Sequence, residues 1–104
     1  MSQINIADGY TTVASANSSG VLGASTVKAD NLILVAHKSS KTENAGTVYF
    51  MKTGGSVRIP LEPGDIMSLV SPGGEELTLD QFTIENVNAG DGVGYMAIEH
   101  SPFD

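Results

Sequence analysis

The chain contains no cysteine, so neither disulfide bonds nor thiolate metal sites can hold its fold together. No apolar run approaches the ~20 residues that a membrane helix needs. The opening residues, MSQINIADG, lack the basic start and the continuous apolar core of a secretory signal. We therefore expect a product of the cytoplasm with no membrane segment, whose stability comes from packing and from contacts with partner subunits.

Basic residues are scarce and unevenly placed. Lys and Arg number 5 against 12 Asp and Glu, for a net charge of −7, and every Lys and Arg precedes Pro60. Because phosphate binding depends on clustered Lys and Arg, nucleic acid is not an expected partner. The acidic second half has two open interpretations, a solvated face or a surface matched to a basic partner.

The composition is that of one folded all-β domain. Apolar residues at 40% with charged residues at 16% argue against disorder, and 12 glycines and 4 prolines leave little room for long helices. Short strands with turns about every ten residues predict a small antiparallel β-sandwich or a jelly-roll-like barrel. In residues 75–81, Thr78 is positioned to cap a single helical turn. The expected strands are 31–38, 47–53, 56–59, 65–70, 81–87 and 93–100.

Turn residues give more local predictions. Gly54-Gly55 predicts a tight two-residue hairpin, and Pro60 is expected to end its pairing. Pro63-Gly64 suits the two central positions of a type II turn. Residues 88–92 predict a five-residue loop that joins the last two strands as a hairpin.

Apolar patterning predicts the core. Residues 31–38 are apolar at successive positions, which is typical of a central strand covered on both faces. Residues 93–98 alternate, with Val93, Tyr95 and Ala97 opposite Gly94, Met96 and Ile98. The expected core residues are Leu32, Leu34, Val48, Phe50, Val57, Ile59, Ile66, Phe82, Ile84, Met96 and Ile98.

The first 30 residues differ from the rest. We expect residues 1–30 to form an N-terminal arm, or an extended segment with an edge strand, and residues 31–104 to form the β-sandwich domain. Residues 14–29 are mostly small, which is typical of an arm or a long loop. The arm is favoured over the acidic residues as the docking element, because those residues are scattered over several strands and turns. The expected partner-binding residues are Ile4, Ile6, Val21 and Leu22.

No catalytic, cofactor-binding or metal-binding residues are predicted, and the chain is not expected to be an enzyme. Its serines lie in no Gly-x-Ser-x-Gly elbow, and only His37 and His100 are available as a base. Neither histidine nor the acidic residues have metal-site spacing. Asp91 in GDGVG is expected to serve a turn, with a cation site shared with Asp65 or Glu99 as the alternative. The glycines of that loop precede a strand, which excludes a phosphate loop.

The last half of the chain, VYFMKTGGSVRIPLEPGDIMSLVSPGGEELTLDQFTIENVNAGDGVGYMAIEH, resembles small virion structural proteins of tailed bacteriophages, most closely the head decoration (cement) proteins. The order of parts carries the resemblance: a strand pair, a Pro-Gly-Asp turn, a Leu-Asp-Gln-Phe strand entry and a Gly-rich loop before the final strand. It implies a non-enzymatic subunit, commonly trimeric, that binds the major capsid protein on the exterior of a virion after synthesis in the host cytoplasm. Open edge strands also predict a homo-oligomer, most simply a homotrimer.

Two alternatives remain open. A phage fibre or tail module that recognises a glycan or a receptor would have a similar strand pattern. The motif PLEPGD is similar to the Pro-Gly turn of cupin barrels, but DIMSLVSPGG follows it where a cupin metal site needs His-x-His. Only a metal-free cupin-like barrel is therefore compatible with the sequence.

Overall fold

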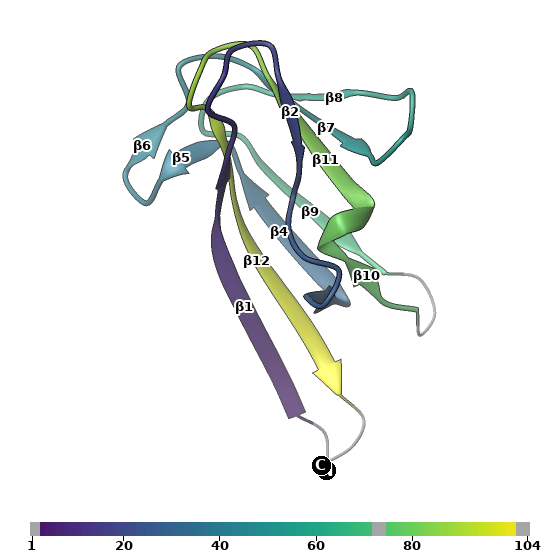
Figure 1. Cartoon of the computed structure of the whole chain (residues 1–104). Coiled ribbons are helices and arrows are strands. Elements are labelled where there is room, and N and C mark those ends of the chain that lie inside the picture. Colours follow the sequence, from purple (N-terminus) through teal and green to yellow (C-terminus); the bar gives the residue numbers. More distant parts are fainter. Residues whose placement is uncertain (1–2, 72–74, 102–104) are drawn as a thin grey trace.

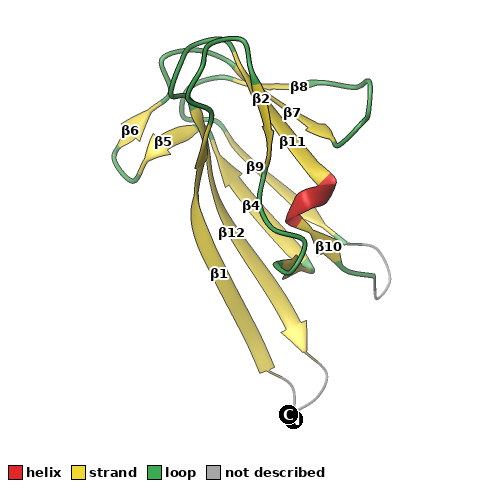
Figure 2. Cartoon of the chain, viewed as in Figure 1, coloured by secondary structure: helices red, strands yellow, loops and turns green. Residues whose placement is uncertain are grey.

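A computed structural model describes residues 3–71 and 75–101 as two antiparallel four-stranded sheets packed into a β-sandwich (Figures 1 and 2). Sheet A has the order β1 (Gln3–Thr12), β12 (Gly92–Ser101), β4 (Asn31–Val35) and β9 (Ile66–Val70). Sheet B has the order β2 (Ser19–Val21), β11 (Phe82–Asn86), β7 (Val48–Lys52) and β8 (Ile59–Leu61). Over these residues neither sheet closes into a barrel, so the predicted all-β sandwich is confirmed.

Smaller elements complete the fold. Two short ladders pair β3 (Lys28–Ala29) with β10 (Leu77–Thr78) and β5 (His37–Ser39) with β6 (Thr42–Glu43). A single 3-10 turn, η1 (Leu79–Gln81), leads into β11, with Thr78 as its cap as predicted. Within residues 3–71 and 75–101, no helix is long and apolar enough to cross a membrane.

The core lies between the sheets and follows the two-residue period of the strands. In β4 the side chains of Leu32 and Leu34 are buried whereas Ile33 is exposed, so the prediction that this strand is covered on both faces is wrong. The core residues are Leu22, Ala29, Leu32, Leu34, Ala36, Val48, Phe50, Leu61, Leu79, Ile84, Val93 and Ala97.

The core prediction is confirmed for five residues and wrong for four. Leu32, Leu34, Val48, Phe50 and Ile84 are buried. Phe82 and Ile98 are half-buried. Val57, Ile59, Ile66 and Met96 are exposed instead. The alternation predicted in β12 is correct, but its buried side carries Val93 and Ala97, because sheet B covers that side.

One predicted turn is confirmed, and one predicted hairpin is wrong. The N–H of Asp65 donates to the carbonyl of Glu62 at 2.9 Å and Gly64 has φ of 85°, which confirms the Pro63-Gly64 turn. The two-residue hairpin at Gly54-Gly55 is wrong, because pairing between β7 and β8 begins only at Ile59. Pro60 lies inside β8 opposite Tyr49, where an edge strand tolerates it because its missing N–H faces no neighbour.

The predicted hairpin between the last two strands is also wrong, because β11 belongs to sheet B and β12 to sheet A. Buried polar side chains direct this crossing. The carboxylate of Asp91 accepts the N–H groups of Ala45 and Gly46, each at 2.9 Å. The side-chain NH₂ group of Asn44 donates to the carbonyl of Gly92 at 2.7 Å, and the side-chain oxygen of Asn44 accepts the N–H of Gly92 at 3.0 Å. These long-range bonds draw the loop over the end of the sandwich, which no local turn signal specifies.

The N-terminal segment is built into the sandwich. Strand β1 pairs with β12 along its whole length, from Gln3 opposite Ser101 to Thr12 opposite Gly92. Leu22 is fully buried in the core, and Thr11 donates a side-chain hydrogen bond to its carbonyl. The described part of residues 1–30 therefore supplies the edge strands β1 and β2 and core contacts, in keeping with the extended segment with an edge strand and not with a free arm, because its backbone groups pair with those of the domain.

Candidate functional site

The side of sheet A that faces away from sheet B, here called the outer face, lies open to solvent. The strand register arranges its side chains in rows across β1, β12, β4 and β9. The rows are Tyr10, Gly94, Val35 and Ile66; then Asp8, Met96, Ile33 and Ser68; then Ile6, Ile98, Asn31 and Val70; with Ile4 and His100 beyond them.

The outer face is rich in exposed large apolar side chains. Ile66, Val70 and Ile4 are 74%, 73% and 63% exposed, and Ile6, Tyr10, Met96 and Ile33 are exposed beside them. Single exposed apolar residues are ordinary, but contiguous apolar patches of this kind mark interaction sites. The outer face therefore has the character of a surface that another protein covers.

The opposite surface of the sandwich is built differently. On sheet B, the hydroxyl groups of Thr53 and Thr83 are hydrogen-bonded at 2.9 Å. Arg58 forms an ion pair with Glu85 and lies 5.7 Å from the ring centre of Tyr49. These contacts pair polar side chains on the surface of sheet B, where Val21 on the edge strand β2 is also exposed.

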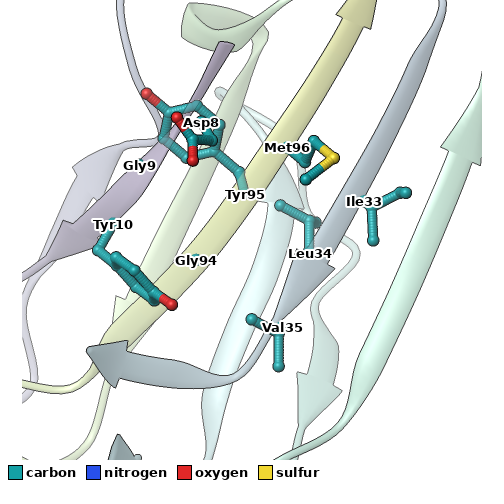
Figure 3. Close-up of a pocket in the computed structure, with 9 residues that line it drawn as sticks. All are labelled: Asp8, Gly9, Tyr10, Ile33, Leu34, Val35, Gly94, Tyr95 and Met96. Carbon is teal, nitrogen blue, oxygen red and sulfur yellow. The ribbon is translucent and has the colours of Figure 1, made fainter. Parts of the chain in front are cut away.

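A hollow of about 230 Å³ lies in the outer face beside Gly94 (Figure 3). Gly94 has no side chain, and a Cβ atom there would stand 2.5 Å from the Tyr10 ring and 3.1 Å from Val35. Ile33 and Met96 also line the hollow. The Tyr10 ring and Val35 therefore already cover Gly94, and the hollow lies beside them at one end of the sheet, with Asp8 also in its lining.

A second apolar surface, here called the mouth, opens where the edge strands β8 and β9 diverge. It holds a cavity of about 390 Å³. The rings of Phe50 and Phe82 are stacked there with centres 5.1 Å apart, and Val57 is 72% exposed on the rim. Its lining includes Phe50, Lys52, Val57, Ile59, Met67, Leu69 and Phe82.

The structure separates the four predicted partner-binding residues. Ile4 and Ile6 lie on the outer face, next to each other on β1. Val21 is exposed on β2, the edge strand of sheet B. Leu22 is fully buried in the core, so its side chain is not presented to a partner. Ile4 and Ile6 thus belong to one surface that the other two residues do not share.

The groups considered for catalysis or metal binding are dispersed. His37 is half-buried on β5, and His100 is exposed on β12. Asp91 is fully buried, serves backbone N–H groups and lies 3.8 Å from the Lys38 ammonium. Within residues 3–71 and 75–101, no three His, Asp or Glu side chains are grouped to hold a metal ion.

One surface carboxyl group, that of Glu76, has a raised pKa. A side-chain hydrogen bond with Glu99 raises the pKa of Glu76 above its ordinary value of 4.5, and the charge of Glu99 acts in the same direction. Lys28 opposes the shift. The pair is a local electrostatic feature of the surface, and Glu76 is itself exposed.

Most residues of the outer face were misassigned as core or not singled out from the sequence. The signal was nevertheless present, because residues 31–35 and 93–98 are apolar on both strand faces although a two-sheet sandwich covers only one. In the mouth, Val57 and Ile59 were likewise expected in the core. Comparison of the chain with protein-family models, with curated protein sequences and with solved structures found no match.

Proposed function

We propose that this protein is a non-enzymatic structural subunit that decorates the exterior of a phage capsid and stabilises it by binding the major capsid protein. The observation that carries the proposal is an excess of core-type side chains exposed in two separate surfaces, the outer face and the mouth. A protein that cements an assembly works by burying surface against its neighbours, and it must hold two contacts at once. The resemblance of the last half of the chain to decoration proteins supplies the identity of the assembly.

We assign the capsid contact to the mouth and its occupant to an extended apolar segment of the major capsid protein. Each described edge strand that flanks the cavity, β8 in sheet B and β9 in sheet A, pairs on one side only. An added strand can pair with such an edge while its alternate side chains enter the cavity. The apolar rim formed by Val57 and Ile59 suits this mode, and Lys52 beside it suits an acidic residue of the segment.

The test is co-sedimentation with capsid shells assembled from a major capsid protein encoded in the same genome as this chain. Val57→Asp places a charge on the rim of the mouth, in the connection between β7 and β8, so folding should be retained. We expect this variant to lose at least ~30-fold in shell affinity, the size of a hot-spot effect. The matched control is Val87→Asp, which changes another exposed valine far from the mouth lining.

Two outcomes would contradict the proposal. One is wild-type protein that remains in the supernatant at every shell concentration. The other is a folded Val57→Asp variant that binds shells as the wild type and Val87→Asp do, because the contact would then lie elsewhere. Stabilisation itself is measured as the temperature at which decorated and bare shells release their contents.

Recognition of a glycan receives no comparable support. Sugar rings stack on exposed aromatic side chains, and such a role would be favoured by aromatic residues clustered on one face. Among the strongly exposed large apolar residues of the described chain, Tyr10 is the one aromatic. The aliphatic character of both surfaces favours a protein partner.

A further inference from the structure

The outer face remains uncovered when the mouth is assigned to the capsid protein. Its exposed fractions in Ile6, Tyr10, Ile33, Ile66, Val70 and Met96 together amount to more than three fully exposed large residues. At about 180 Å² for each, within the range of large side chains, this is on the order of 600 Å². A standard protein interface buries ~800 Å² per partner, so the outer face supplies most of the area that a stable dimer needs.

We infer that the outer faces of two copies pack against each other, forming a twofold dimer whose axis runs parallel to the strands between β12 and β4. Two sheets packed face to face about 10 Å apart are the same arrangement that builds the core of each copy. A second copy of the chain is the partner that covers the outer face, because it offers an apolar sheet of the same width and area.

The strand order makes the outer face complementary to itself about this axis. The rotation places β1 of one copy over β9 of the other, and β12 over β4. Within each row, Tyr10 then meets Ile66 of the second copy, and Met96 meets Ile33. Ile6 likewise meets Val70 of the second copy. Apolar side chains thus face apolar side chains across most of the interface.

Gly94 of one copy lies opposite Val35 of the other, because these residues are neighbours in one row on β12 and β4. The Tyr10 ring and Val35 of the same copy already lie over Gly94, so the valine of the second copy packs against the Tyr10 ring at the edge of the hollow.

The position of Asp8 selects this axis over the other twofold possibility. An axis that crosses the strands along the middle row would place Asp8 against Asp8 of the second copy, and like charges in contact oppose association. The axis parallel to the strands places the carboxylate of Asp8 over the hydroxyl group of Ser68, which can donate to it. Within one copy these residues lie on the two edge strands, about 14 Å apart at ~4.8 Å per strand.

Sedimentation velocity of the isolated protein over a concentration series tests the dimer. We expect a concentration-dependent dimer for the wild type. Ile66→Asp and Ile6→Asp should each raise the dissociation constant at least ~30-fold while leaving the circular dichroism spectrum unchanged, since both side chains are exposed in the single copy. Val87→Asp is the matched control, and it should dimerise as the wild type does.

A charge cycle tests the axis. Ser68→Lys should tighten the dimer, and Ser68→Asp should weaken it, because each new side chain faces Asp8 of the second copy. The difference between the two variants should largely vanish when Asp8 is replaced by Asn. A purely structural role of Ser68 would not depend on Asp8 in this way, because the two residues are too far apart in one copy to interact directly.

The inference does not depend on the capsid assignment, since dimerisation is measured without shells. A strictly monomeric wild type at high concentration would overturn it, as would a closed trimer, which a twofold face-to-face contact cannot form. Dimerisation that persists in folded Ile66→Asp and Ile6→Asp would place the contact elsewhere. A charge cycle without coupling to Asp8 would refute the proposed axis. Failure of Val57→Asp to alter shell binding concerns the mouth alone and leaves the dimer unaffected.

Discussion

Asp91 is predicted to be the most stabilising single polar side chain in the described part of the chain. Its carboxylate is fully buried and accepts two backbone N–H groups, from Ala45 and Gly46, each at 2.9 Å. A hydrogen bond to a charged group contributes ~1.5–3 kcal/mol, and a buried donor left without an acceptor adds a desolvation cost. Because the two N–H groups are only partly buried, water can reach them after truncation, and we expect Asp91→Ala to cost about 3–5 kcal/mol.

Urea unfolding followed by circular dichroism measures this loss. With a slope of ~1–3 kcal/mol per molar urea, the midpoint should fall by more than about 1 M, a large part of the ~5–15 kcal/mol margin of a small domain. Asp91→Asn should be intermediate, because an amide oxygen can accept one N–H while its NH₂ group opposes the other.

The matched control is Asp65→Ala. Asp65 is exposed and its carboxylate accepts one backbone N–H, from Glu62 at 2.8 Å, within a four-residue turn. We expect its replacement to cost no more than about 1 kcal/mol. A loss below about 1 kcal/mol for Asp91→Ala, or wild-type stability for Asp91→Asn, would show that the carboxylate does not hold the loops together.

Three further measurements test the packing and the electrostatics. Phe50→Ala should cost about 3–5 kcal/mol in the free energy of unfolding, and Phe82→Ala distinctly less, because Phe50 is buried and Phe82 half-buried; equal losses in urea would contradict this burial difference. Gly92→Ala should lower the melting temperature strongly, because the new Cβ would lie 2.0 Å from a backbone carbonyl oxygen of β1; a shift of under about 2 °C would show that β1 can move aside. The pKa of Glu76 is raised in the folded state, so just above pH 4.5 the folded protein binds more protons than the unfolded chain. Protonation of Glu76 therefore stabilises the fold at low pH, and this stabilisation is lost as the pH rises through the folded-state pKa. Glu76→Gln, which removes the titrating partner of Glu99, should flatten that part of the melting-temperature profile, and an unchanged profile would contradict the assignment.

The sequence by itself determined the features that depend on neighbouring residues. The Pro63-Gly64 turn follows from the fixed φ of proline and the positive φ that glycine allows. The cap at Thr78 follows from local hydrogen bonding. The alternation in 93–98 follows from the two-residue period of a strand, and the all-β class follows from many such short segments.

The tertiary structure decided which side of each strand became the core. Strands β4 and β12 are apolar on both sides, so nothing local distinguishes Ile33 from Leu34, or Met96 from Ala97. Only the position of sheet B buries one side and leaves the other as the outer face. The same holds for the loop after β11, because the buried bonds of Asp91 reach groups about 45 residues away in the chain. Contacts of that range arise from the packed fold, and the local sequence pattern carries no record of them.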